Sequence, residues 1–334
     1  LHPEMCERDF ARIHAISEGA LVAAQVGAGA IRLRPDVDTL LNGLTACGEV
    51  MALTRNESAV HEKIGPYEKV VFGARASMVL GAQIDLRIFP GQWAFGFAVE
   101  KTAEDGALRR SLQFFDHQGM AIHKVHARPA TNLEAWAVLI DNLRHPDQVD
   151  AITLSAPKTP EAMGPAAGLE QLRERWLAMT DTHQFFGLLR ELNLHRLDAL
   201  EMVGEDLAFQ LDHAAVSGLF EAAVTAQLPI MAFVGNHGCI QIHSGPIQTV
   251  KPMGPWLNVM DDTFHLHLRL DQIAAVWAVR KPTTDGHVTS VEVYDANREL
   301  IIQFFGKRQE GHAERSEWRT LVDALPLFAQ SNAA

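Results

Sequence analysis

The stretch Ala52-Leu-Thr-Arg-Asn56 recurs 180 residues later as Ala232-Phe-Val-Gly-Asn236. The same offset relates Gly65-Pro66 to Gly245-Pro246. Further matches follow, with a one-residue slip at two of them: Val70/Val250, Leu86/Leu266, Ala98-Val99/Ala278-Val279, Lys101/Lys281, Asp105-Gly106/Asp285-Gly286, Ser111/Ser290, Asp116/Asp295, Ile122/Ile302 and Arg128/Arg308. A nearly constant offset over about 80 residues indicates a duplicated domain.

Each copy is expected to open with helices and to continue as strands. In the second copy, Trp176, Met179, His183 and Phe186 recur at helical spacing. A second helical run, Leu197, Leu200 and Val203, is followed by Gly204 as a stop signal. Alternating segments then predict strands at 263–269, 275–279, 288–294 and 300–305, with first-copy counterparts at 84–89, 93–99 and 112–115.

The pattern predicts an α+β fold in tandem duplication, each half a large antiparallel sheet with a helical layer. Three prolines and two glycines between Leu154 and Gly168 indicate a linker. We therefore place the N-terminal repeat at residues 1–150, the linker at 151–168 and the C-terminal repeat at 169–334. The length of 334 residues also favours two domains.

Charge and composition narrow the class of protein. The chain carries 29 basic and 41 acidic residues, a net charge of -12, which disfavours generic nucleic-acid binding. No apolar run approaches the length of a membrane span, and no secretion signal is visible at the start of the sequence. Three unpaired cysteines fit a reducing compartment, so we expect a cytoplasmic protein.

The sequence lacks several common catalytic motifs. There is no Walker loop, Gly-x-Ser-x-Gly elbow or His-Glu-x-x-His motif, and Cys47 and Cys239 are expected to be buried thiols. His265 and His267 share one face of a predicted strand, but no third metal ligand accompanies them. From spacing alone, His183 is interpreted as a histidine that faces the core and finds a hydrogen bond.

The run Met179-Thr-Asp-Thr-His-Gln-Phe-Phe-Gly-Leu-Leu189 resembles the heme-ligand helix of the bacterial cytoplasmic hemin-degrading and hemin-transport proteins. Residues 230–245, 254–259 and 280–290 are similar to the same family. The resemblance covers nearly the whole chain and includes the duplication. It implies that the cofactor is heme b and that His183 is the axial ligand of its iron.

The resemblance also implies roles for other residues. Arg87 matches the family's distal arginine, which reaches over the opposite heme face. Four residues match positions near the propionates or the porphyrin edge: Arg196, Lys281, Gln303 and Arg308. Phe305 stands where relatives often carry tyrosine, so stacking on the porphyrin is retained without the hydroxyl.

The duplication predicts one principal site, built from the C-terminal helix and the N-terminal sheet, because its halves are not equivalent. Arg87 pairs with His267 in the repeat, and His183 falls opposite the region of Cys6. His61 is a candidate for weaker heme binding, although we expect it to be a surface histidine.

Two functional classes stay open at this point. One is a cytoplasmic carrier that receives imported heme from an inner-membrane importer and passes it to a heme oxygenase. The other is an enzyme that opens the porphyrin ring with O2 or peroxide and an electron donor. The absence of a visible reductant-binding motif favours the carrier. A third class is a duplicated β-sheet interaction module without a cofactor.

Overall fold

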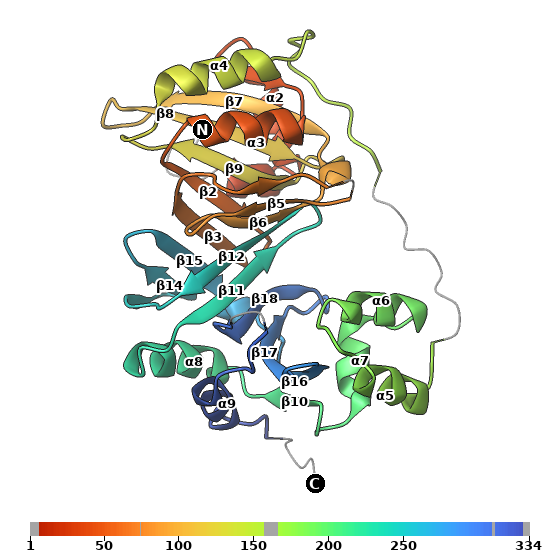
Figure 1. Cartoon of the computed structure of the whole chain (residues 1–334). Coiled ribbons are helices and arrows are strands. Elements are labelled where there is room, and N and C mark those ends of the chain that lie inside the picture. The colour runs from red at the N-terminus through yellow and green to blue at the C-terminus, as the bar shows by residue number, and fades with distance from the viewer. Residues whose placement is uncertain (1–6, 74, 157–165, 309–310, 330–334) are drawn as a thin grey trace.

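The computed structural model describes residues 7–73, 75–156, 166–308 and 311–329 and has an α+β architecture built on two nine-stranded antiparallel sheets (Figure 1). The elements before residue 150 are, in order, α1 (Glu7–Ile13), α2 (Glu18–Ala23), β1 (Ala30–Leu33), α3 (Val37–Ala46), β2 (Val50–Arg55), β3 (Ala59–Gly65), β4 (Val70–Val71), β5 (Ser77–Leu80), β6 (Asp85–Ile88), η1 (Pro90–Gln92), β7 (Phe95–Thr102), β8 (Leu108–Phe115), β9 (Ala121–Ala127) and α4 (Leu133–Leu143).

The second half repeats this order with one additional helix before its first strand. Its elements are α5 (Leu169–Leu177), α6 (Gln184–Glu191), α7 (Arg196–Val203), β10 (Ala208–Leu211), α8 (Ala214–Thr225), β11 (Ile230–Gly235), β12 (Cys239–Gly245), β13 (Val250–Met253), β14 (Trp256–Met260), β15 (Phe264–Arg269), η2 (Leu270–Gln272), β16 (Ala275–Thr283), β17 (Gly286–Tyr294), β18 (Leu300–Gly306) and α9 (Ser316–Asp323). The predicted strands and the duplication are confirmed.

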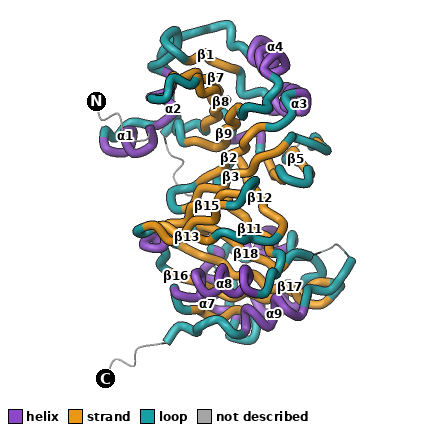
Figure 2. The backbone as a smooth tube through the Cα atoms, turned by 90° about the vertical axis from the view of Figure 1, so that its left-hand side faces the viewer, coloured by secondary structure: helices purple, strands orange, loops and turns teal. Residues whose placement is uncertain are grey.

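The two sheets exchange strands, which the sequence did not reveal. The N-terminal sheet has the order β1-β7-β8-β9-β2-β3-β15-β14-β13, and the C-terminal sheet has the order β10-β16-β17-β18-β11-β12-β6-β5-β4. Each half therefore gives three strands to the other half's sheet. The repeated Gly-Pro pairs, 65–66 and 245–246, mark the departure points, since proline cannot donate to the ladder. Figure 2 shows β3, β15, β12 and β11 gathered at the middle of the molecule.

The junction between the halves is fixed by the repeated asparagines that opened the sequence comparison. Asn56 Oδ1 accepts the backbone N–H groups of Ser58 and Ala59, and its amide donates to Ile301 O at 2.8 Å. Asn236 repeats the turn and donates to the carbonyls of Arg55 and Ile122, both at 2.9 Å. Each asparagine thus shapes its own hairpin and ties it to the other sheet.

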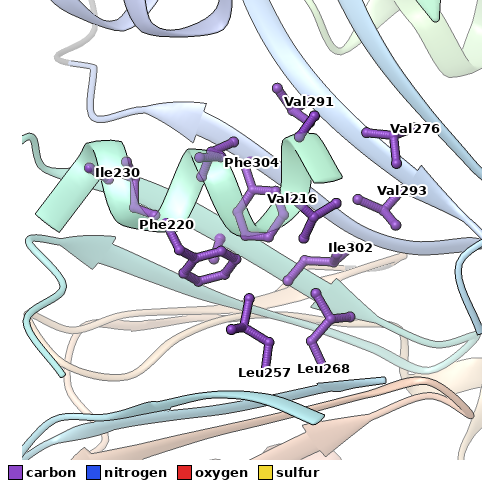
Figure 3. Close-up of a cluster of buried hydrophobic side chains, with 14 of the residues drawn as sticks. Val216, Phe220, Ile230, Leu257, Leu268, Val276, Val291, Val293, Ile302 and Phe304 are labelled. Atoms are coloured by element: carbon purple, nitrogen blue, oxygen red, sulfur yellow. The ribbon is translucent and has the colours of Figure 1, made fainter. Parts of the chain in front are cut away.

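Helices cover both faces of each sheet in part. One face of the C-terminal sheet packs against α8 and α9 through a core that includes Val216, Phe220, Ile302 and Phe304 (Figure 3). Phe220 and Phe304 meet edge to face with ring centroids 5.2 Å apart. On the opposite face, α5–α7 pack over β10, β16 and β17 around Trp176. In the N-terminal sheet, α3 and α4 cover one face and α2 covers part of the other.

The helices of the second half differ from expectation at one point. The helix that ends before Gly204 is confirmed as α7, and Gly204 takes a positive φ of 102°. The spacing from Trp176 to Phe186, however, does not lie on one helix: α5 ends at Leu177 and α6 begins at Gln184. The break places His183 in a turn. Part of the expected linker, residues 157–165, lies outside the described residues.

Candidate functional site

His183 lies immediately before α6, and its side chain is 94% exposed. Its Nδ1 is 2.7 Å from Asp181 Oδ1, the same oxygen that accepts the His183 backbone N–H at 2.8 Å. These two hydrogen bonds lower the pKa of the Asp181 carboxyl, so the carboxylate is the acceptor and Nδ1 the donor. The lone pair of the ring is then on Nε2, the nitrogen that can ligate a metal. His183 does not face the core, contrary to the interpretation from its spacing.

The face of the C-terminal sheet that carries α5–α7 continues past them as a set of eight positions, the apolar strip. Strand register places these residues on one face: Arg87, Met231, Phe233, Gly235, Ile240, Ile242, Gln303 and Phe305. Ile242 is buried and the others are half-buried. Apart from Arg87 and Gln303, the strip offers apolar side chains or backbone. Such a surface suits a flat apolar ligand.

Arg87 reaches this strip through the strand exchange. It lies on β6, which pairs with β12 so that Arg87 stands opposite Ile240. Three strand spacings of ~4.8 Å separate β6 from β18, so Arg87 lies roughly 14 Å across the sheet from β18. Its guanidinium contacts the Asp85 carboxylate and the Leu86 carbonyl. Arg87 therefore comes from the first half but lies on the second half's sheet. The expectation that the N-terminal sheet carries it was wrong, because β6 crosses to the other sheet.

Arg196 and Lys281 converge on the buried carboxylate of Glu292. Arg196 donates to both Glu292 oxygens at 2.8 and 2.7 Å, and Lys281 Nζ lies 2.7 Å from Oε1. Gln303 donates to the same Oε1 at 3.1 Å, and Tyr294 donates its hydroxyl to Oε2 at 2.6 Å. We call Arg196, Lys281 and Glu292 the C-terminal ion cluster.

Burial and charge act in opposite directions in this cluster. Burial alone would raise the pKa of Glu292, but Arg196 and Lys281 hold it well below its usual range. Burial lowers the pKa of Lys281 to about 8, against the attraction of Glu292. One excess positive charge is left after the carboxylate is balanced. Both cations also lie over the Phe185 ring, at 5.1 Å for Arg196 and 4.7 Å for Lys281.

Aromatic residues around His183 divide into core and surface. Trp176 and Met179, expected on the ligand face of a continuous helix, are buried with Phe185 because the chain turns between α5 and α6. Phe186 is 70% exposed and remains beside the site. On the strip, Phe305 packs edge to face on Phe233 at 5.1 Å.

Arg308 follows β18 and is half-buried. It lies near enough to Asp181 to make a small contribution, after the His183 hydrogen bonds, to lowering the pKa of that carboxyl. The turn that carries His183 and the end of β18 are thus electrostatic neighbours. Asp181, Phe185 and Glu292 were not among the residues selected from the sequence. Glu292 could have been found from the alternation of the strand predicted at 288–294, which places it on the same sheet face as Ser290.

The matching positions of the N-terminal sheet form a different surface, the charged strip. In the same order it carries His267, Met51, Leu53, Arg55, Val60, Glu62, Lys124 and His126. His265, beside it, bonds Glu62 at 3.0 Å, and His267 bonds Asn258 at 2.6 Å. Among the described residues, no three His, Cys, Asp or Glu side chains are grouped to hold a metal ion.

Two further expectations concern buried groups. His61 is fully buried against Phe264, so the expectation of a surface histidine was wrong; the exchanged strand β15 covers it. Cys47 and Cys239 are buried as predicted, and burial raises the pKa of their thiols to about 11 and about 12. None of the helices in the described part of the chain is long and apolar enough to span a membrane.

Comparisons with known proteins identify the family. The model of the haemin-degrading HemS.ChuX domain matches residues 15–143 and 193–325. The hemin transport protein HmuS of Yersinia pestis is 42% identical over 325 residues, which cover 97% of this chain and 94% of that protein. Among solved structures, holo-PhuS, a heme-binding protein from Pseudomonas aeruginosa, is 44% identical with a TM-score of 0.94, covering 98% of this chain and 95% of that one.

The Escherichia coli O157:H7 heme-degrading enzyme ChuS is 37% identical with a TM-score of 0.91, and the match covers 97% of this chain and 95% of that one. The matches extend over almost the full length of both partners in each comparison. The chain belongs to the haemin-degrading HemS/ChuX domain family.

Proposed function

We propose that this protein binds heme b with Nε2 of His183 as the axial ligand of the iron. One observation carries the proposal: an exposed imidazole, held through Nδ1 by a carboxylate, stands on the side of the sheet that bears the apolar strip. The residues present fit the group, since a neutral imidazole suits heme iron and the half-buried strip suits the macrocycle. Bound heme would supply the redox-active iron.

The cations near this face have three roles in the proposal. Arg87 is the candidate distal residue, because it lies on the sheet face that carries the apolar strip. Arg308 stands beside Asp181 and is available for a propionate. Arg196 and Lys281 act through the net positive charge of their cluster, because their direct contacts go to Glu292. Local charge of this sign accommodates an anionic cofactor despite the net charge of -12.

We further propose that the protein acts as a cytoplasmic carrier in iron acquisition. It would receive heme from an inner-membrane importer and pass it to a heme oxygenase. An axial ligand on an exposed turn supports reversible ligation, because capture and release do not require a core to open. The alternative is opening of the porphyrin ring with O2 or peroxide and an electron donor, where Arg87 would orient the oxygen ligand. Relatives include both a hemin transport protein and a heme-degrading enzyme.

One experiment separates carrier from enzyme. The purified heme complex is incubated with an electron donor and catalase, and then with a heme oxygenase. The carrier function predicts that the Soret band persists until the oxygenase is added and that intact heme then appears on that enzyme. Catalytic formation of a tetrapyrrole product before addition would support the enzyme instead. No Soret band after hemin addition would contradict both and favour an interaction module.

A further inference from the structure

The backbone of the turn that carries His183 is held by hydrogen bonds although the histidine side chain is exposed. The backbone N–H of Thr284, in the β16–β17 hairpin, donates to Thr180 O at 3.0 Å. Gln184 Oε1 accepts the backbone N–H groups of Thr180 and Asp181 at 2.9 and 3.3 Å. The Asp181 carboxylate therefore has a fixed place from which to hold the imidazole.

We propose that Asp181 is a positioning residue that sets how strongly His183 donates electrons to heme iron. This rests on the proposed heme function. Asp181 Oδ1 bonds both the backbone N–H and the ring Nδ1 of the same histidine, which fixes the plane of the ring and its tautomer. A charged acceptor on Nδ1 makes the ligating nitrogen more basic. A more basic axial ligand stabilises ferric iron over ferrous iron and lowers the midpoint potential.

A purely structural role makes a different prediction. If Asp181 serves only as the acceptor for the backbone N–H at the start of α6, an amide oxygen replaces it adequately. Asp181→Asn keeps an acceptor oxygen at this position and removes the charge. The variant therefore separates electronic tuning from capping. Since the Asp181 side chain is 57% exposed, the substitution leaves no cavity.

The test uses the full chain reconstituted with hemin. For Asp181→Asn we expect ferric heme affinity to fall by about tenfold with ferrous affinity unchanged, the lower end of the effect of outer-shell partners. A tenfold fall in ferric relative to ferrous affinity raises the midpoint potential by ~59 mV for a one-electron couple. The Fe–His stretching frequency of the ferrous complex, measured by resonance Raman, falls as well. Glu205→Gln removes an exposed carboxylate from the same half and leaves both readouts unchanged.

Two outcomes overturn the proposal and can be told apart. If Asp181→Asn keeps the wild-type potential and Fe–His frequency while His183→Ala loses the axial-ligand spectrum, heme binds as proposed and Asp181 is only a cap. If His183→Ala retains the wild-type spectrum and hemin affinity, the ligand assignment fails, and the role of Asp181 fails with it. Thermal unfolding of the heme-free variants checks that each is folded.

Discussion

The two halves present the same sheet face with opposite chemistry. At the eight matched positions, the apolar strip has one ionisable residue, Arg87, whereas the charged strip has His267, Arg55, Glu62, Lys124 and His126. Arg55 and Lys124 are already buried against Glu18. A macrocycle placed on the charged strip would also have to desolvate the half-buried Glu62, at a cost of several kcal/mol unless it is paired. Duplication thus provided two platforms, and the residues at matched positions suit only one of them to heme.

The buried ion clusters of the two halves are alike in number of charges but not in arrangement. In the C-terminal half, the helix residue Arg196 and the strand residue Lys281 balance Glu292. In the N-terminal half, the helix residue Glu18 balances Arg55 and Lys124 on strands. Each cluster leaves one positive charge, so net charge does not explain why the strips differ. The strips differ in the side chains that they present at the surface.

The largest expected effect concerns these clusters. Glu292→Gln leaves Arg196 and Lys281 without their carboxylate, and Glu18→Gln does the same to Arg55 and Lys124. Loss of one partner from a buried ion pair costs about 3–5 kcal/mol. We therefore expect both variants to lose stability to a similar degree in urea unfolding. A loss below about 1 kcal/mol in either would show that its cluster is solvated and that the parallel between the halves is false.

One residue of the apolar strip can be replaced by its counterpart in the charged strip. Ile242→Glu gives the apolar strip the residue that the charged strip has in Glu62. Because Ile242 is buried without heme, the new carboxylate can reach water only by displacing neighbouring residues of the strip, so we expect hemin affinity of the folded variant to fall at least about tenfold, or ~1.4 kcal/mol. Glu62→Gln is the matched control and should leave affinity unchanged. Unfolding of the heme-free proteins corrects for lost stability, and equal affinity in folded Ile242→Glu would contradict the strip as binding surface.

Acid should destabilise strands β8 and β9 of the N-terminal sheet more than their matched strands β17 and β18 of the C-terminal sheet. His123 is fully buried with its pKa lowered to about 3 by burial, and it hydrogen-bonds Thr54 and Tyr67. Strand register puts Ile302, which the sequence offset pairs with Ile122, at the position on β18 that matches His123. Below pH 6.5 the unfolded chain binds a proton that the buried imidazole does not bind, so the free energy of unfolding decreases as the pH falls. At pH 5 the free energy of unfolding is therefore lower by about 2 kcal/mol than at neutral pH because of His123.

Hydrogen exchange measures this difference. Amides of β8 and β9 should lose protection between pH 7 and pH 5 after correction for intrinsic exchange, while amides of β17 and β18 retain it. Equal loss of protection in both sheets would contradict a specific effect of His123.

The smallest expected effect is spectroscopic. Arg87→Ala should retain hemin binding but change the ligand at the sixth coordination position and the rate of autoxidation. His267→Ala, the matched position in the other strip, should leave the spectrum unchanged. Identical visible spectra for wild type and Arg87→Ala would argue against a distal role for Arg87.

Sequence reasoning reached the α+β fold, the duplication and the strands because alternation and a fixed offset are local signals. It missed the strand exchange, since a strand's hydrophobic alternation does not specify which sheet it joins. That exchange is why His61 is buried and why Arg87 lies on the second half's sheet. Asp181 and Glu292 escaped notice because their importance comes from partners: a backbone turn for Asp181 and residues up to 96 positions away for Glu292.

The break between α5 and α6 shows the same limit at shorter range. Trp176, Met179, His183 and Phe186 satisfy helical spacing, yet the turn at 178–183 puts the first two in the core and the last two at the surface. The family resemblance directed attention to His183, and the turn explains how its imidazole becomes available.

Stoichiometric titration with hemin tests the central claim most directly. The wild type should bind one equivalent with the Soret band of a histidine-ligated heme. His183→Ala should lose that band and most of the affinity, while His237→Ala, an exposed histidine in the β11–β12 turn, should match the wild type. Two equivalents bound by the wild type, or one equivalent bound unchanged by His183→Ala, would contradict a single heme site on the C-terminal half.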